Sequence, residues 1–217
     1  DAKVIRTKNR PIASDKVTIK LAIIYSAGLC FLALLVLLNF NPFTIILALS
    51  SMPLAFSYPL MKRYTYWPQL FLGITFNYGL ILGWTSIKGG VDLTPVLFYL
   101  GAIFWTLGYD TIYGYQDIKD DEIIGLKSTS IKFKEEPKQF LFFCYTSLII
   151  LFLIGGYFMK FNYIYFLLFV ITSFHLLFFQ LKIFNFKSPS SYLRAFKSNN
   201  FLGLIIFLNI LIAKYLI

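Results

Sequence analysis

Charge is what this sequence lacks most. Of its 217 residues, only 14% are charged, whereas 58% are hydrophobic, and the mean hydropathy is +0.71. Soluble domains carry about 25% charged residues. So few polar side chains could not cover the surface of a soluble domain. The composition therefore excludes that class and indicates a protein whose solvent is a lipid bilayer.

Cysteine and histidine are almost absent. Cys30 and Cys144 both lie in apolar segments without CxxC spacing, which predicts two small buried hydrophobic side chains and no disulfide. His175 is the only histidine and lies in TSFHLLFFQ. We expect it to be packed and hydrogen-bonded rather than catalytic, because intramembrane ionisable groups are rare.

The chain also lacks the alternating polarity of membrane strands, which disfavours a β-barrel. Instead it holds apolar segments, most of them long enough to cross about 30 Å of hydrocarbon as helices. The predicted fold is all-α: a multi-pass transmembrane helical bundle forming a single domain over 1–217. Its loops are expected to be short except at 117–138 and 185–197, and Pro53 should kink the second helix. The seven predicted spans are 17–38, 43–60, 68–86, 95–116, 138–158, 161–184 and 198–216.

Basic residues are distributed very unevenly over the predicted loops. All but three of the 20 lysines and arginines fall on the side of the N-terminus; the exceptions are Lys88, Lys160 and Lys214. This positive-inside pattern predicts a cytoplasmic or matrix-side N-terminus and an outside C-terminus. It also indicates attraction to anionic membrane lipid rather than binding to nucleic acid, because the basic residues are scattered over helix ends.

Acidic residues gather in one segment, GYDTIYGYQDIKDDEIIGLKS, at 108–128. If the fourth helix continues through residue 121, Asp117 and Asp121 lie at about −20° and +20° from Asp110, on one stripe. The DxxxD spacing places Asp117 and Asp121 side by side. Asp110 would lie about 10 Å deeper in the membrane.

Such a cluster is costly without a cation. Two carboxylates about 5.5 Å apart repel by roughly 3 kcal/mol at an effective dielectric of 20. Mg²⁺ binds one or two carboxylates together with substrate phosphates. We therefore favour a metal-bridged diphosphate site at the cytoplasmic mouth of the bundle, with a solvated, charge-rich loop as the alternative. Nearby, Arg63 lies in an aromatic frame (Tyr58, Tyr64, Tyr66 and Trp67) that equally suits a substrate site or an interfacial belt.

Three segments carry a family resemblance: RTKNRPIAS, YPLMKRYTYWPQLFLGITFNYGLILGW and DTIYGYQDIKDDEIIGLKSTSIKF. Together they closely resemble the UbiA family of intramembrane prenyltransferases, and YPLMKRYTYWPQ is most similar to its 4-hydroxybenzoate polyprenyltransferase branch. The resemblance implies nine transmembrane helices and two Asp-rich motifs that bind Mg²⁺ and an isoprenyl diphosphate. Asp117 and Asp121 match the second motif, and Asp1 matches only the last aspartate of the first. The chain is therefore expected to lack the first two helices and most of the first motif.

The resemblance also implies roles for individual residues. Catalytic roles are expected for Asp117, Asp121, Asp110 and Arg63, with Arg63 holding the acceptor's carboxylate. The expected metal ligands are Asp117, Asp121 and Asp1. The expected substrate-binding residues are Arg6, Arg10, Lys62, Lys127, Tyr113 and Asn77, the basic ones surrounding the diphosphate. Tyr115, Trp84 and Trp105 are further aromatic candidates beside a carbocation, with helix packing as the simpler alternative.

The activity that the resemblance implies is Mg²⁺-dependent transfer of a polyprenyl group to an aromatic acid, most simply 4-hydroxybenzoate, in ubiquinone biosynthesis. The expected partners are the two substrates and membrane lipid, with no obligate protein partner. The expected location is the bacterial plasma membrane, with the mitochondrial inner membrane as the alternative. The rival function is an ion-coupled transporter, disfavoured because transporters place ionisable groups near the bilayer midplane. A CDP-alcohol phosphotransferase would by resemblance need a DG-x-x-AR run, which this sequence lacks.

Overall fold

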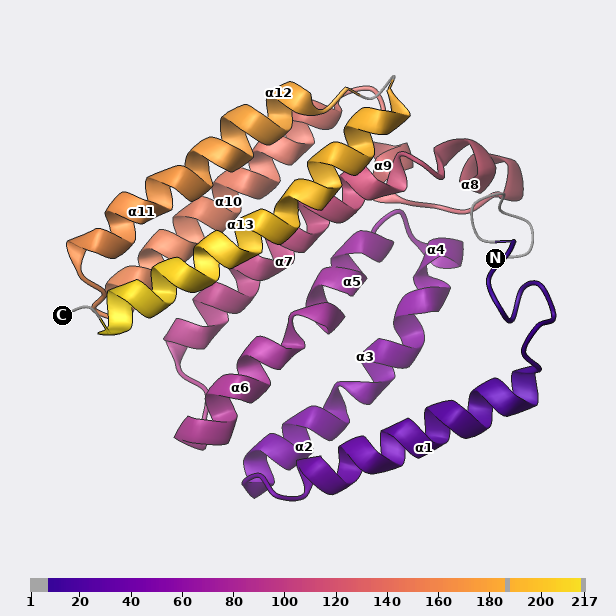
Figure 1. Cartoon of the computed structure of the whole chain (residues 1–217), viewed down its shortest axis with the longest axis horizontal. Coiled ribbons are helices and arrows are strands. Elements are labelled where there is room, and N and C mark those ends of the chain that lie inside the picture. The colour runs from indigo at the N-terminus through magenta and orange to yellow at the C-terminus, as the bar shows by residue number, and fades with distance from the viewer. Residues whose placement is uncertain (1–7, 186–187, 216–217) are drawn as a thin grey trace.

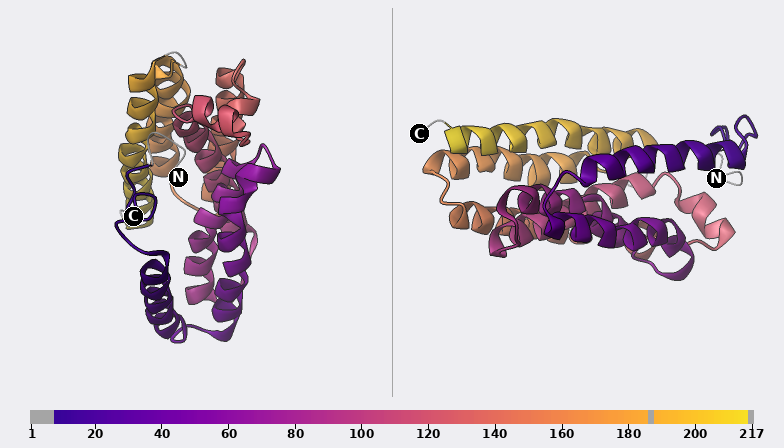
Figure 2. Two further views of the ribbon diagram at one scale, coloured as in Figure 1. Left: turned by 90° about the vertical axis from the view of Figure 1, so that its right-hand side faces the viewer. Right: turned by 90° about the horizontal axis from the view of Figure 1, so that it is seen from below.

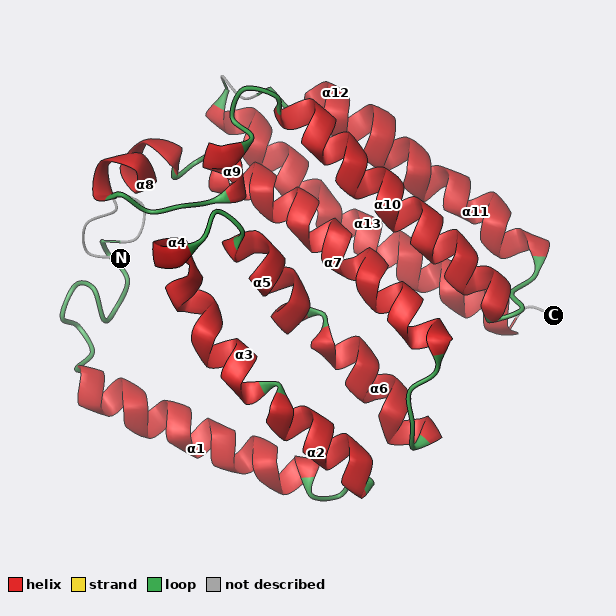
Figure 3. Ribbon diagram, turned by 180° about the vertical axis from the view of Figure 1, so that it is seen from behind, coloured by secondary structure: helices red, strands yellow, loops and turns green. Residues whose placement is uncertain are grey.

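The computed structural model describes residues 8–185 and 188–215, which form helices joined by short loops without strands (Figure 3). The all-α prediction is therefore confirmed. In chain order the elements are α1 (Ile19–Leu37), α2 (Pro42–Ser50), α3 (Met52–Ser57), η1 (Tyr58–Leu60), α4 (Met61–Tyr64), α5 (Pro68–Phe76), α6 (Tyr78–Lys88), α7 (Leu93–Gly114), α8 (Ile118–Ile124), α9 (Thr129–Lys132), α10 (Pro137–Phe158), α11 (Tyr163–Phe174), η2 (His175–Gln180), α12 (Leu181–Ile183) and α13 (Pro189–Tyr215).

Six helical stretches of the described chain are long and apolar enough to cross a membrane: Ile19–Leu37, Pro42–Tyr64, Pro68–Lys88, Pro137–Phe158, Tyr163–Ile183 and Ser190–Tyr215. They match six of the seven predicted spans. The remaining prediction corresponds to α7, which has 22 residues but a more mixed composition, because threonines, glycines, tyrosines and Asp110 dilute its apolar residues. The chain is an integral membrane protein with a multi-pass helical fold.

α7 is the central helix of the bundle. It packs against α5 and α6 on one side and against α10 and α13 on the other (Figure 1). Two glycines of α7 permit close contact with α10, since a Cβ at Gly101 or Gly108 would collide with the rings of Phe152 or Tyr145. The less apolar helix is thus the one most covered by protein rather than lipid.

Two predicted spans are interrupted. A turn at Ser51, just before Pro53, separates α2 from α3, which confirms the predicted kink, because proline lacks the N–H that would continue the helix. The sequence did not predict the break at Asn77 between α5 and α6. There the Asn77 side chain donates to the carbonyl of Gly73 (2.8 Å) and competes with the regular helical bonds.

Different segments of the chain lie at the two ends of the bundle. The described N-terminal segment, α4, α8 and α9 lie at one end, and the C-terminal end of α13 lies at the other (Figure 1). This arrangement agrees with an odd number of crossings. The loop predicted over 185–197 is wrong in part, because α13 already begins at Pro189, and Tyr192 and Ala195 are buried in the core. The segment 117–138 likewise holds two short helices, α8 and α9.

α1 is the most exposed helix. None of its residues is buried, and it stands apart from α7 and α10 in the side view (Figure 2). Cys30 lies on it and is exposed, so its predicted burial is wrong, whereas Cys144 is buried in α10 as predicted; neither forms a disulfide. His175 is packed against Phe179 and lies 3.2 Å from the Ser198 hydroxyl, as predicted.

Candidate active site

A tight turn interrupts the acidic segment between α7 and α8. α7 ends at Gly114, and the amides of residues 115, 116 and 117 each donate to the carbonyl three residues earlier. The predicted helix through residue 121 is therefore wrong, because this overwound turn redirects the chain before α8 starts. The stripe that would align Asp110 with the two later aspartates is broken at this point.

The DxxxD pair itself keeps its helical spacing. Asp117 is the N-cap residue of α8, and the Asp121 amide donates to the Asp117 carbonyl at 2.8 Å. Both side chains are buried, with exposed fractions of 6% for Asp117 and 2% for Asp121. Two neighbouring aspartates removed from water need compensating charge, since an unpaired buried carboxylate is costly.

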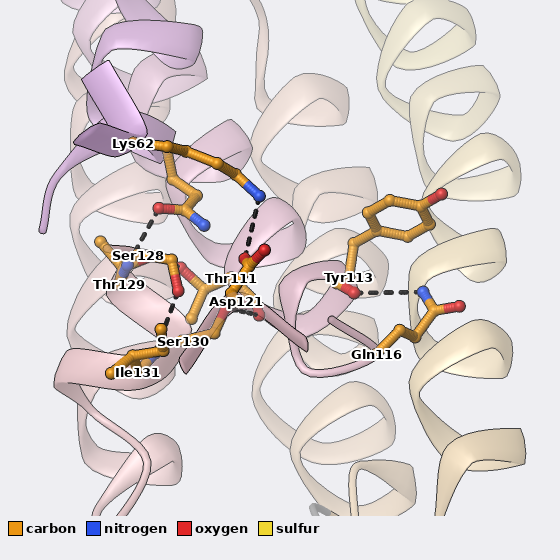
Figure 4. A network of polar contacts seen from close by, with 10 residues as sticks. Lys62, Thr111, Tyr113, Gln116, Asp121, Ser128, Thr129, Ser130 and Ile131 are labelled. Carbon is orange, nitrogen blue, oxygen red and sulfur yellow. Dashed lines mark hydrogen bonds and ion pairs between the residues drawn. The ribbon is translucent and has the colours of Figure 1, made fainter. Parts of the chain in front are cut away.

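Lys62 supplies part of that charge. Its Nζ lies 3.0 Å from Asp121 Oδ2, reaching from α4 onto α8 (Figure 4). Lys62 and Asp117 also interact electrostatically with Asp110, which is half-buried near the end of α7. The structure thus brings together Lys62 and the three predicted aspartates, although they do not share one helical stripe.

A buried polar anchor holds this end of the bundle, and the sequence did not predict it. The Thr129 amide donates to Gln69 Oε1 (2.9 Å), and the Ser130 hydroxyl donates to the Thr111 carbonyl (2.7 Å). The Thr111 and Thr129 hydroxyls lie 2.6 Å apart (Figure 4). These bonds fix α9 to α5 and α7, and so fix the far end of the α8 loop. The available signal was the polar run Ser128–Ser130 after the acids.

A second set of bonds joins this loop to α4. The Lys127 amide donates to the Lys62 carbonyl at 2.8 Å, and Lys127 Nζ donates to the Tyr64 carbonyl at 3.3 Å. Lys127 also lies 5.5 Å from the centre of the Tyr66 ring. The predicted substrate-binding lysines at 62 and 127 are therefore neighbours, brought together from distant parts of the sequence.

The aromatic frame around Arg63 divides into two parts. Arg63, Tyr64 and Tyr66 are exposed at the end of the bundle. Trp67 instead packs edge-on against Phe133 in the core, with Lys132 Nζ 4.5 Å from its ring centre. Arg63 makes no ion pair with the part of the chain that the structure describes, so its predicted role stays a prediction.

Other predicted substrate residues contact different parts of the bundle. Tyr113 packs its ring 4.5 Å from that of Phe196 on α13. Asn77 donates to Thr106 Oγ1 (2.8 Å) and to the Ala102 carbonyl (3.2 Å), which links the α5–α6 break to α7. Arg10 is exposed in the loop before α1. Asp1 and Arg6 lie outside the described residues.

Two of the other aromatic candidates, Tyr115 and Trp105, form hydrogen bonds within the bundle. The Tyr115 hydroxyl donates to the Phe133 carbonyl (3.1 Å), and Trp105 Nε1 donates to Asn199 Oδ1 (2.8 Å). Asn199 also accepts from Gln180, which accepts from Tyr145, so a polar chain crosses four helical elements inside the apolar core. Trp84 lies on α6 with its buried Nε1 lacking a hydrogen-bond partner among the described residues.

The donor set suits a divalent cation. Among residues 8–185 and 188–215, no three acidic, histidine or cysteine side chains gather closely enough to hold a metal ion. Mg²⁺ does not need three, because it usually takes one or two carboxylates and completes its shell with waters and phosphate oxygens. Two buried aspartates one helical turn apart therefore fit the ion.

Comparison with known proteins places this arrangement in context. The sequence profile of the UbiA prenyltransferase family matches residues 1–210. The chain is similar to proteins described as "4-hydroxybenzoate polyprenyltransferase, mitochondrial": it is 43% identical to that of Bos taurus over 99% of this chain and 58% of the relative. For Homo sapiens the values are 49%, 65% and 38%, and for Dictyostelium discoideum 40%, 100% and 47%. The chain thus spans about half the length of the curated relatives it matches.

A solved structure supports the fold independently. The apo structure of a UbiA homolog from Aeropyrum pernix K1 superposes with a TM-score of 0.80, covering 96% of this chain and 78% of that one. The two sequences are only 20% identical, so the likeness concerns the arrangement of helices alone.

Proposed function

The chain belongs to the UbiA prenyltransferase family, and from that membership we propose that the protein transfers a polyprenyl group from a polyprenyl diphosphate to 4-hydroxybenzoate, in ubiquinone biosynthesis. The observation that carries the proposal is the pair of buried aspartates, Asp117 and Asp121, beside Lys62 at one end of the bundle. Two buried carboxylates beside a lysine suit a multiply charged anion that is bridged by a cation.

Asp117 and Asp121 are the proposed holders of Mg²⁺. The ion would neutralise the diphosphate and so help it leave. Lys62 pairs with Asp121, and Lys127 is bonded to the backbone of Lys62. Both would contact diphosphate oxygens, since ammonium groups form strong charge-assisted bonds to phosphate. Arg63 would bind the carboxylate of the aromatic acid from the exposed rim, a role for which its planar fork is suited.

The reaction also requires the bundle to shield and stabilise a carbocation. Breaking the C–O bond of the allylic diphosphate leaves a carbocation, which the ring carbon ortho to the acceptor's hydroxyl attacks; the ring then loses a proton. Water would quench that cation, so the reaction needs a shielded site. Aromatic rings stabilise positive charge through their faces, and Tyr113 on α7 is the candidate nearest to the aspartates in sequence.

The relatives' names favour one membrane over the other. They are mitochondrial enzymes, which supports the mitochondrial inner membrane in place of the bacterial plasma membrane. The transporter alternative has less support, because the described acids near the site lie at a helix end and not at the middle of a span.

The test uses membranes that carry the full-length protein. They would be incubated with labelled 4-hydroxybenzoate, a polyprenyl diphosphate and Mg²⁺, and label would be measured in the lipid phase. We expect label to enter lipid only when all three are present. Transfer that persists in excess EDTA, or label that remains in the aqueous phase throughout, would contradict the proposal.

A further inference from the structure

We propose that Lys62 is a placeholder cation: before substrate binds it holds Asp121, and on loading it releases Asp121 to the metal ion and turns to the diphosphate. This inference rests on the proposed function, because that function brings both the metal and the diphosphate to the site. It adds an exchange of partners that a fixed set of ligands would not require.

The first support is the unequal burial of the two partners. The Nζ–Oδ2 distance of 3.0 Å is that of a hydrogen-bonded ion pair, yet the Asp121 side chain is only 3% exposed and the Lys62 side chain 38%. The Asp121 carboxylate lies inside the bundle, whereas the Lys62 side chain is partly exposed to solvent. The lysine is therefore the partner that can leave.

The second support is the fixed base from which Lys62 extends. Its carbonyl accepts the Lys127 amide at 2.8 Å, and the neighbouring Tyr64 carbonyl accepts Lys127 Nζ at 3.3 Å. These bonds tie α4 to the loop that follows α8, so the backbone of Lys62 keeps its place relative to Asp121. An exchange of partners then needs only side-chain rotation of a long, flexible lysine.

The third support is charge balance. Lys62 is the lysine that acts on Asp110 as well as pairing with Asp121. Removing such a partner leaves a buried charge uncompensated, so the unloaded site needs this lysine. A divalent ion on the same carboxylate would repel the ammonium strongly at such short range. Loading therefore displaces Lys62, and an incoming diphosphate offers it new oxygens nearby.

The experiment measures metal binding without diphosphate, in purified full-length protein, using Mn²⁺ and electron paramagnetic resonance. Lys62→Met keeps the length of the side chain but removes its charge, and we expect it to tighten Mn²⁺ binding by about tenfold or more. Adding a polyprenyl diphosphate should improve Mn²⁺ binding less in this variant than in the wild type, because the displaced lysine no longer contributes.

A second variant should change the Mn²⁺ affinity in the opposite direction, so the proposal can still be tested if the first variant misfolds. Lys62→Arg retains the charge and can grip Asp121 with two parallel bonds, so we expect it to weaken Mn²⁺ binding by several-fold. Lys134→Met is the matched control, because Lys134 pairs with Glu122 at 2.8 Å on the exposed side of α8 and its loss should leave Mn²⁺ affinity unchanged.

Unchanged or weaker Mn²⁺ binding in Lys62→Met would overturn the placeholder role, and so would tighter binding in Lys62→Arg. Prenyl transfer measured in the same wild-type preparations decides separately on the proposed function. If the wild type is active but substitutions at Lys62 leave Mn²⁺ affinity unchanged, only the exchange of partners is rejected. Inactive wild type rejects the proposed function itself.

Discussion

Two neighbouring acids on α8, Asp121 and Glu122, are each paired with a lysine at a similar distance, but the two pairs differ in burial. Lys62 lies 3.0 Å from Asp121, and Lys134 lies 2.8 Å from Glu122. The Asp121 side chain is 3% exposed, whereas that of Glu122 is 41% exposed. Consecutive helical residues point about 100° apart, so one acid enters the bundle while the next faces outward.

Burial, and not the presence of an ion pair, separates a candidate site from a surface contact. Water screens the outer pair, and exposed pairs of this kind contribute little. The inner pair is desolvated, so its carboxylate interacts strongly with any cation that reaches it. A series of substitutions on the two sides of α8 tests this difference.

The largest effect is expected from neutralising the inner acids. Asp121→Asn and Asp117→Asn in the full-length protein should each lower prenyl transfer by several orders of magnitude, because each removes a ligand charge that offsets the diphosphate. Rates would be measured in membranes at saturating Mg²⁺. Glu122→Gln is the matched control and should keep near wild-type turnover. Near wild-type turnover in both Asn variants would reject the metal site.

The next effect comes from the turn that directs Asp121 inward. A Cβ at Gly114 would collide with Ser130 Oγ, which is held by its bond to the Thr111 carbonyl. Gly114→Ala should therefore displace α9 from α7, destabilise the protein by about 2 kcal/mol and lower activity roughly tenfold.

Gly79 provides the control for that substitution. A Cβ there has nothing within 4 Å, so Gly79→Ala should be neutral or slightly stabilising. Thermal unfolding in detergent and transfer rates in membranes would be compared for both variants. Equal behaviour of the two alanines would mean that the turn does not set the position of α8.

Composition and apolar runs were sufficient to predict the fold class and the spans. They did not predict the break at Asn77 or the π-helical turn at His175–Gln180, because both depend on side chains that bond across helices. They also misplaced the start of α13, since polar residues near 190 resemble a loop until Tyr192 and Ala195 find partners in the core.

The candidate site was predictable only in part. The DxxxD spacing identifies Asp117 and Asp121, and the resemblance points to Lys62 and Lys127. No sequence pattern shows that Lys62 and Asp121 meet, because 59 residues separate them in the chain. The anchor formed by Gln69 and Thr129 was missed for the same reason. A polar residue in an apolar sequence can be assigned to the buried core only when its hydrogen-bond partner is known.

A moderate effect on stability is expected at that anchor. Gln69→Leu leaves the buried Thr129 amide without its acceptor at 2.9 Å, which should destabilise the protein by about 1–2 kcal/mol. Gln116→Leu is the comparison, because the Tyr113 carbonyl that it releases still accepts the backbone amide of residue 116. If both variants unfold at the same temperature, α9 is not held by Gln69.

The smallest effect is expected on the outer face. Lys134→Ala removes the partner of Glu122, whose side chain stays exposed to solvent. Transfer should therefore stay within about twofold of wild type, and the unfolding temperature should not change. Raising the salt concentration should likewise leave this variant and wild type alike, since the pair they differ by is already screened. The measurement matters because Lys134 and Lys62 both contact α8 by the same chemistry. A loss at Lys134 comparable to that at Asp121 would mean that the total charge at this end of the bundle, and not the buried pair, controls activity.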